Sequence, residues 1–126
     1  MIRLSWGLWQ YSYMRKKYFY THIVDISTLS LELGDMDLSP SERIHLLSLI
    51  DSNIHHAVLD LVLSELAPMD KKTFLTHLAS ENHIKVWKFL NEKIKNIEEK
   101  IKKTAEDLKK ELHKDIREAA LPANNS

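Results

Sequence analysis

The chain has 126 residues, of which 44% are hydrophobic and 29% charged, so it is long enough for one folded domain and too apolar for wholesale disorder. It contains no cysteine, which excludes a disulfide framework, a thiolate metal site and a thiol nucleophile. Only two glycines and three prolines occur, and this composition favours a few long elements over a many-turned β-sandwich or barrel.

The formal net charge is zero, but the charges are segregated along the chain. Residues 1–24 carry four bases and no acid, residues 25–70 carry nine acids and one base, and residues 71–126 carry thirteen bases and nine acids. This pattern predicts complementary faces, within one chain or between two, and it argues against a general nucleic-acid binder. No run approaches 18 consecutive apolar residues, so we expect no membrane-spanning helix, and we expect a cytoplasmic protein.

The N-terminal segment differs from the rest of the chain, because seven of the ten aromatic residues lie within residues 1–20, next to arginine and lysine. Tryptophan and tyrosine beside basic residues suit a membrane surface, but we do not expect a membrane partner. The alternative is an extension that does not belong to the native protein, since Met14 and Met36 offer internal starts. The expected organisation is an aromatic and basic extension (1–22), a single helical domain (23–121) and a disordered tail (122–126).

The segment Tyr18–Ile26 is rich in β-forming residues and predicts a short strand or an extended arm before the first helix. A lone strand is not stable by itself, so this arm would need a helical surface to lie on.

The first helix is predicted over about 40–66. Ser39 and Glu42 have the spacing of a capping box around Pro40, which suits the first helical position. Apolar residues then recur at three- and four-residue steps, and Leu46 and Leu49 widen the apolar face, so we expect more than one neighbour. Pro68 is expected to end this helix.

Three further helices follow. Asp70 is predicted to cap a helix over 71–79, with Met69 and Phe74 at the spacing of a hydrophobic staple. The next helix is predicted over 83–94 after a short turn. The last helix is predicted over 97–118, with Asn96 as its N-cap. The fold class is therefore all-α, with four helices and an N-terminal extended or short-strand arm.

The last helix carries a narrow apolar stripe, which favours packing against another helix in a bundle or a coiled coil. We therefore expect a non-enzymatic protein–protein interaction module that self-associates or binds another helical protein through its first and last helices. The candidate interface residues are Ile54, Val58, Leu61, Ile101, Leu108, Leu112 and Ile116.

Two alternatives remain open. The helices over 71–79 and 83–94, joined by a short turn, could form a helix-turn-helix that binds nucleic acid, although the turn lacks a glycine. The pairs Asp51–His55 and His56–Asp60 have the i, i+4 spacing that chelates a divalent ion, and this spacing indicates a histidine-based metal protein; the two further histidines that might complete such a site are His77 and His83. Adjacent positions on a helix point about 100° apart, so the two pairs cannot share one ion.

No pattern indicates catalysis. The chain has no glycine-rich phosphate loop, nucleophile elbow or H-E-x-x-H motif. We therefore expect no enzyme activity, no catalytic or metal-binding residue, no cofactor and no small-molecule substrate.

From about residue 23 onward the chain resembles a family of short, all-helical bacterial proteins of unknown function. The residues that carry this resemblance are Ile23–Leu33, Leu38-Ser39-Pro40-x-Glu42, Leu47, Ile54, Val58, Phe74-Leu75, Phe89-Leu90, Ile94-x-Asn96-Ile97 and Leu108-x-x-Glu111-Leu112. They are packing and capping residues, so the resemblance implies a helical fold and no particular activity.

Overall fold

The computed structural model describes residues 17–26, 29 and 33–120. This part of the chain contains a short 3₁₀-helix and four α-helices, and no strand, which confirms the all-α prediction. The predicted tail 122–126 and residues 1–16 of the predicted extension lie outside the described residues. The elements are η1 (Thr21–Ile23), α3 (Pro40–Ser64), α4 (Pro68–Ala79), α5 (His83–Lys93) and α6 (Ile97–Ala120).

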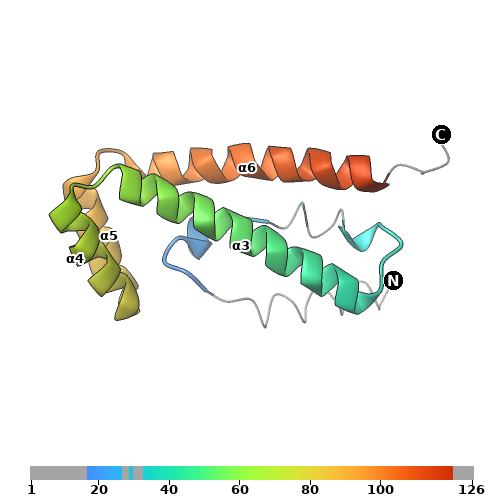
Figure 1. Cartoon of the computed structure of the whole chain (residues 1–126), viewed down its shortest axis with the longest axis horizontal. Helices are drawn as coiled ribbons and strands as arrows, with labels where there is room; N and C mark the ends of the chain where they lie inside the picture. Colours follow the sequence, from blue (N-terminus) through green and yellow to red (C-terminus); the bar gives the residue numbers. More distant parts are fainter. Residues whose placement is uncertain (1–16, 27–28, 30–32, 121–126) are drawn as a thin grey trace.

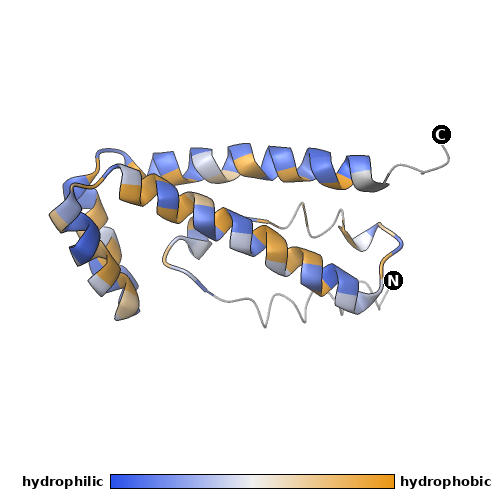
Figure 2. Ribbon diagram, in the orientation of Figure 1, coloured by the Kyte–Doolittle hydropathy of each residue, from blue (hydrophilic) through white to orange (hydrophobic). Residues whose placement is uncertain are grey.

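The two long helices, α3 and α6, lie side by side, and the two short helices, α4 and α5, form a hairpin at the end where α3 finishes and α6 begins (Figure 1). Toward the first turn of α3 the two long helices diverge (Figure 1). Figure 2 shows that α6 is hydrophilic over most of its surface, whereas α3 carries apolar residues along its whole length. A helix with only a narrow apolar stripe buries one side, and a broader face needs several neighbours.

The start of α3 confirms the capping box. The Ser39 hydroxyl accepts a hydrogen bond from the Glu42 backbone N–H at 3.2 Å, and the Glu42 carboxylate accepts one from the Ser39 backbone N–H at 2.8 Å. These bonds satisfy two of the backbone donors that a helix start leaves unpaired.

The strand alternative for Tyr18–Ile26 is wrong for the described residues, because the chain there forms η1 between extended stretches. Phe19 and Tyr20 are consecutive and both are buried to 1% exposure. A strand lying on one helical surface would bury only alternate side chains, whereas this turn lets both side chains enter the core. The turn is closed locally, since the Ile23 backbone N–H donates to the Tyr20 carbonyl at 2.9 Å.

The predicted start of the second helix is also wrong. The helix α4 begins at Pro68, and Ala67 provides an N-cap without a side-chain hydrogen bond. Proline lacks the backbone N–H that would be unpaired at this position, so Pro68 starts α4, whereas α3 has already ended at Ser64. Asp70 lies in the first turn, and Met69 is 79% exposed and makes no staple.

The turn before α6 differs from the predicted cap. Asn96 has a φ of 56°, in the left-handed region, whereas an N-cap residue is extended. Asparagine tolerates this conformation better than most residues, so Asn96 reverses the chain between α5 and α6. The helix that follows reaches Ala120, two residues beyond the predicted end, and α5 ends at Lys93, one residue early.

The hydrophobic core joins the arm to all four helices. Its buried residues are Phe19, Tyr20, Val24, Ile26, Leu29, Leu33, Leu47, Ile50, Ile54, Val58, Val62, Leu66, Phe74, Val86, Leu90, Ile94, Ile97, Ile101 and Ala105. Phe19 and Tyr20 belong to the segment 1–22 that we expected to be a separate extension. The described end of that segment is therefore part of the core.

By its length and its composition alone, α3 could cross a membrane, whereas we expected no membrane-spanning helix from the sequence. A core helix of a soluble protein passes the same criteria. Because Leu47, Ile54 and Val58 pack in the core, the apolarity of α3 has a structural role in the chain as described.

Candidate functional site

The structure divides the seven predicted interface residues into two groups. Ile54 and Val58 of α3 and Ile101 of α6 are at most 1% exposed. These three side chains lie in the core, in the contact between α3 and α6 of the same chain. They hold the two helices together and are closed to a second molecule while the chain keeps this fold.

The other four residues lie at the edge of the core. Leu61, Leu108, Leu112 and Ile116 are half-buried and pack against it. Leu112 and Ile116 also line a groove between the first half of α3 and the last part of α6. The structure therefore brings together one end of the predicted interface and leaves it partly open.

We call this feature the α3–α6 groove. It has a volume of about 280 Å³. Its lining residues are Leu33, Met36, Leu46, Leu49, Ile50, Asn53, Leu112, Asp115 and Ile116. Only Asn53 and Asp115 are polar, so the groove is an apolar depression with one carboxylate on its α6 side.

The groove exists because the two long helices diverge (Figure 1). Near the start of α6, Ile97, Ile101 and Ala105 are fully enclosed. Farther along, where α6 and α3 separate, residues of the segment before α3 enter the wedge, and Leu33 becomes completely buried there. This filling is incomplete, and Leu49 on the rim stays 47% exposed.

Few charged groups lie near the groove. On the α3 side, Arg43 is half-buried, and its Nε is buried without a hydrogen-bond partner among the described residues. On the α6 side, Asp115 lines the groove and is exposed. Asp115 is therefore the one charged residue among the described residues that line the groove.

Sequence reasoning identified part of this groove and missed the rest. Leu46 and Leu49 broaden the apolar face of the first helix, which is the signal that found them. Leu33 ends the apolar segment Ile23–Leu33, but no local pattern places Leu33 or Met36 beside α6, because only the tertiary structure brings the segment before α3 into the wedge.

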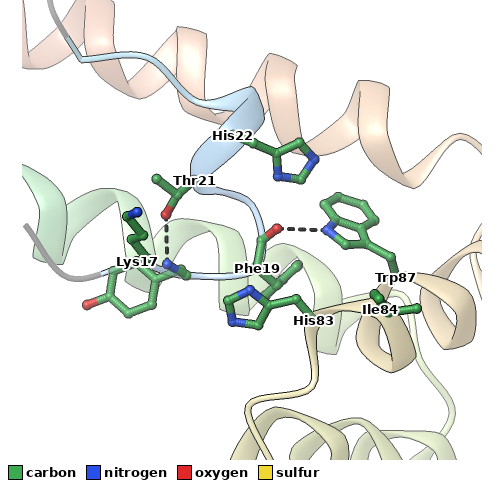
Figure 3. A pocket seen from close by; sticks show the side chains of 8 residues that line it. Lys17, Phe19, Thr21, His22, His83, Ile84 and Trp87 are labelled. Atoms are coloured by element: carbon green, nitrogen blue, oxygen red, sulfur yellow. Dashed lines mark hydrogen bonds between the residues drawn. The ribbon is translucent and has the colours of Figure 1, made fainter.

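A second concave region lies between the arm and α5 (Figure 3). The Trp87 indole N–H donates to the Phe19 carbonyl at 2.7 Å, and the two rings meet edge to face with centroids 5.4 Å apart. The His22 ring also meets the Trp87 ring at 5.7 Å. Sequence analysis found no role for this group, whose members are distant in the chain.

Two of the histidines that suggested a metal site contact aromatic rings. His55 stacks on Tyr18 with ring centroids 3.9 Å apart, and its Nδ1 shares a hydrogen bond with the Tyr20 hydroxyl at 2.9 Å. His77 lies against the Phe89 ring at 5.5 Å. Within residues 17–26, 29 and 33–120, no three histidine, aspartate or glutamate side chains are placed to hold a metal ion.

The helix-turn-helix alternative concerns α4 and α5. Base-contacting residues of such motifs lie at the start of the second helix. Here that start contains Ile84, which is 82% exposed, and His83, and both line the concave region shared with the arm. The first turn of α5 is exposed, so the helix-turn-helix alternative stays a prediction.

No family model matches the chain, and neither a curated protein nor a solved structure is similar to it. The resemblance to short bacterial helical proteins stays a prediction.

Proposed function

We propose that the chain is a non-enzymatic helical interaction module that self-associates as a two-fold dimer through the α3–α6 groove. The observation that carries this proposal is the exposed Leu49 side chain on the rim of an apolar groove. A surface of this kind contains both a projection and a depression.

A two-fold dimer requires a self-complementary surface, because the same patch of each copy meets its counterpart. Leu49 of one copy can enter the groove of the other, while the second Leu49 does the same in return. The size of the groove supports this arrangement. A cavity of about 150 Å³ accommodates benzene, and the groove, at about 280 Å³, is larger.

The charges beside the groove are also compatible with a second copy. Asp115 lines the groove on α6, and Arg43 lies on α3 one turn before Leu46, which also lines the groove. The proposal includes a pair between the Arg43 guanidinium of one copy and the Asp115 carboxylate of the other. Such a pair would contribute to the register more than to the affinity.

The first test is the mass of the full chain in solution as a function of concentration, measured by light scattering after gel filtration. We expect the mass to rise toward that of a dimer in the micromolar range. Full burial of a leucine contributes roughly 1.5–3 kcal/mol, and Leu49 is already about half-buried, so two copies supply about 2 kcal/mol. Leu49→Glu should therefore weaken the dimer by more than about tenfold.

The matched control is Leu75→Glu. Leu75 is 48% exposed, almost the same as Leu49, and it lies on α4, away from the groove. This variant should dimerise like the parent protein. A parent protein that stays monomeric at hundreds of micromolar, or equal effects of the two substitutions, would contradict the proposed interface.

A further inference from the structure

The cavity between the arm and α5 has the dimensions of a small-molecule site. Its volume is about 610 Å³, within the range of about 300–1,000 Å³ typical of ligand pockets. The arm contributes Lys17, Tyr18, Phe19, Thr21 and His22, and the first turns of α5 contribute His83, Ile84 and Trp87 (Figure 3). We call this feature the arm pocket.

The walls of the arm pocket are held in place by hydrogen bonds. Thr21 Oγ1 accepts from the Tyr18 backbone N–H at 2.7 Å, which fixes the turn of the arm. The Trp87 indole is tied to the Phe19 carbonyl, and Phe19 is buried against Phe74 with ring centroids 6.0 Å apart. A ligand would meet preformed walls, so it would lose little affinity to ordering them.

The surfaces offered to a ligand are flat and apolar. Phe19 is 1% exposed, so its ring backs the pocket from the core. The half-buried Trp87 ring, which the His22 ring meets at 79°, is the aromatic surface left to a ligand. Ile84 lines the same pocket and is 82% exposed (Figure 3). These walls suit a planar aromatic body, since aromatic rings pack well edge to face and face to face.

The polar groups that line the arm pocket favour a ligand of negative charge. Lys17 is a cation, and His22 and His83 provide imidazole N–H donors, whereas no residue that lines the pocket is an acid. Glu81 does not line the arm pocket, but it lines an adjacent cavity of about 430 Å³ that shares Lys17, Tyr18, Phe19 and His83 with the pocket. Among the residues that line the arm pocket itself, a cationic ligand would meet Lys17 and no carboxylate.

From these observations we infer that the arm pocket binds an aromatic carboxylate, with the ring against Trp87 and Ile84 and the carboxylate toward Lys17. This site is independent of the α3–α6 groove, and neither proposal depends on the other.

The test is an NMR titration of the full-length protein with 2-naphthoate, with the neutral 2-naphthamide as the comparison ligand. The readout is the indole N–H signal of Trp87, assigned with Trp87→Phe, together with the backbone amides of His83 and Ile84. We expect saturable shifts at these positions and tighter binding of the carboxylate. Lys17→Gln should remove the preference for the carboxylate and leave the affinity for the amide unchanged.

Ile84→Ala should weaken both ligands by about tenfold through lost apolar contact. Its matched control is Met69→Ala, because Met69 is 79% exposed and lies on α4 outside the pocket. The inference is overturned if no saturable shift occurs at millimolar ligand, or if the carboxylate and the amide bind equally well. Equal affinities in Ile84→Ala and Met69→Ala, or shifts confined to the α3–α6 groove, would overturn it as well.

Discussion

Ser39 and Glu42 exchange two hydrogen bonds at the start of α3. The backbone N–H of Ser39, and then its hydroxyl, hold the pKa of the Glu42 carboxyl below its usual range. A carboxyl with a lower pKa in the folded state stabilises the fold above its unfolded-state pKa. This contribution is lost as the pH falls through the folded-state value.

Glu42→Gln keeps an acceptor at this position and removes the charge. We expect the variant to be less stable than the parent near neutral pH, and we expect the difference to disappear as the pH falls from about 6 to about 3. Urea denaturation at a series of pH values measures the free energies of unfolding. A difference that stays constant across this range would show that Glu42 acts through its shape and not through its charge.

Single residues also show why sequence reasoning placed some helix ends correctly and others not. The Ser39–Glu42 cap was predictable because all its parts lie within four residues. Asp70 has the sequence pattern of a cap, but its carboxylate lies 3.7 Å from Lys93 of α5, a partner that local spacing does not reveal. Asn96 was misassigned because a cap and a left-handed turn favour the same residue type.

At the scale of elements, the stripe on α6 is regular in sequence and uneven in burial. Ile97 and Ile101 are fully buried, whereas Leu112 and Ile116 are only half-buried. The spacing of the stripe was sufficient to predict that α6 packs on another helix. The difference along its length depends on the divergence of α3 and α6, and no local pattern encodes that divergence.

Two identical substitutions on α6 measure this difference. Ile101→Ala should destabilise the fold by about 2–5 kcal/mol, because it leaves a cavity in the core. Ile116→Ala should cost less than about 1 kcal/mol in stability, because half of its contacts are absent in the single chain. The measurement is urea denaturation at low micromolar protein. Equal costs would contradict the uneven packing of α6 on α3.

The same two substitutions, Ile101→Ala and Ile116→Ala, also test self-association. Ile116 lines the α3–α6 groove, so Ile116→Ala should weaken the dimer while leaving the monomer folded. The effect of Ile101→Ala on the dimer should follow only from its effect on the fold, since Ile101 is closed to a second molecule.

At the scale of the whole molecule, the predicted charge complementarity is seen within one chain. Lys100 of α6 contacts the Glu65 carboxylate after α3 at 2.6 Å. Lys109 donates to the backbone carbonyl of Asp25, an uncharged acceptor, so only the first of these two contacts is an ion pair. Both contacts join the acidic middle of the sequence to its basic last part. Exposed ion pairs contribute little energy, so these contacts orient α6 and the core provides the stability.

The fold class was predictable because capping and periodicity are local, and four helices of about the right length followed from them. The conformation of the arm was not predictable, because the local sequence around Phe19 and Tyr20 resembles that of a strand. The arm is held by contacts that are distant in sequence, such as the hydrogen bond between Trp87 and the Phe19 carbonyl, 68 residues apart. The α3–α6 groove lies between these cases. Its α3 and α6 residues were recognisable as apolar, but the opening between them depends on how the helices diverge.

The most direct test of the proposed interface uses the absence of cysteine in the chain. Ser52→Cys places a single spin label on an exposed position of α3, three residues after Leu49, and Ser80→Cys places one at the α4–α5 turn, at the other end of the molecule (Figure 1). Pulsed electron–electron double resonance then measures the distance between the spin labels of two copies. We predict a short, narrow distance distribution for Ser52→Cys and a much longer one for Ser80→Cys. No dipolar signal from Ser52→Cys at millimolar protein, or a short distance only from Ser80→Cys, would contradict self-association through the α3–α6 groove.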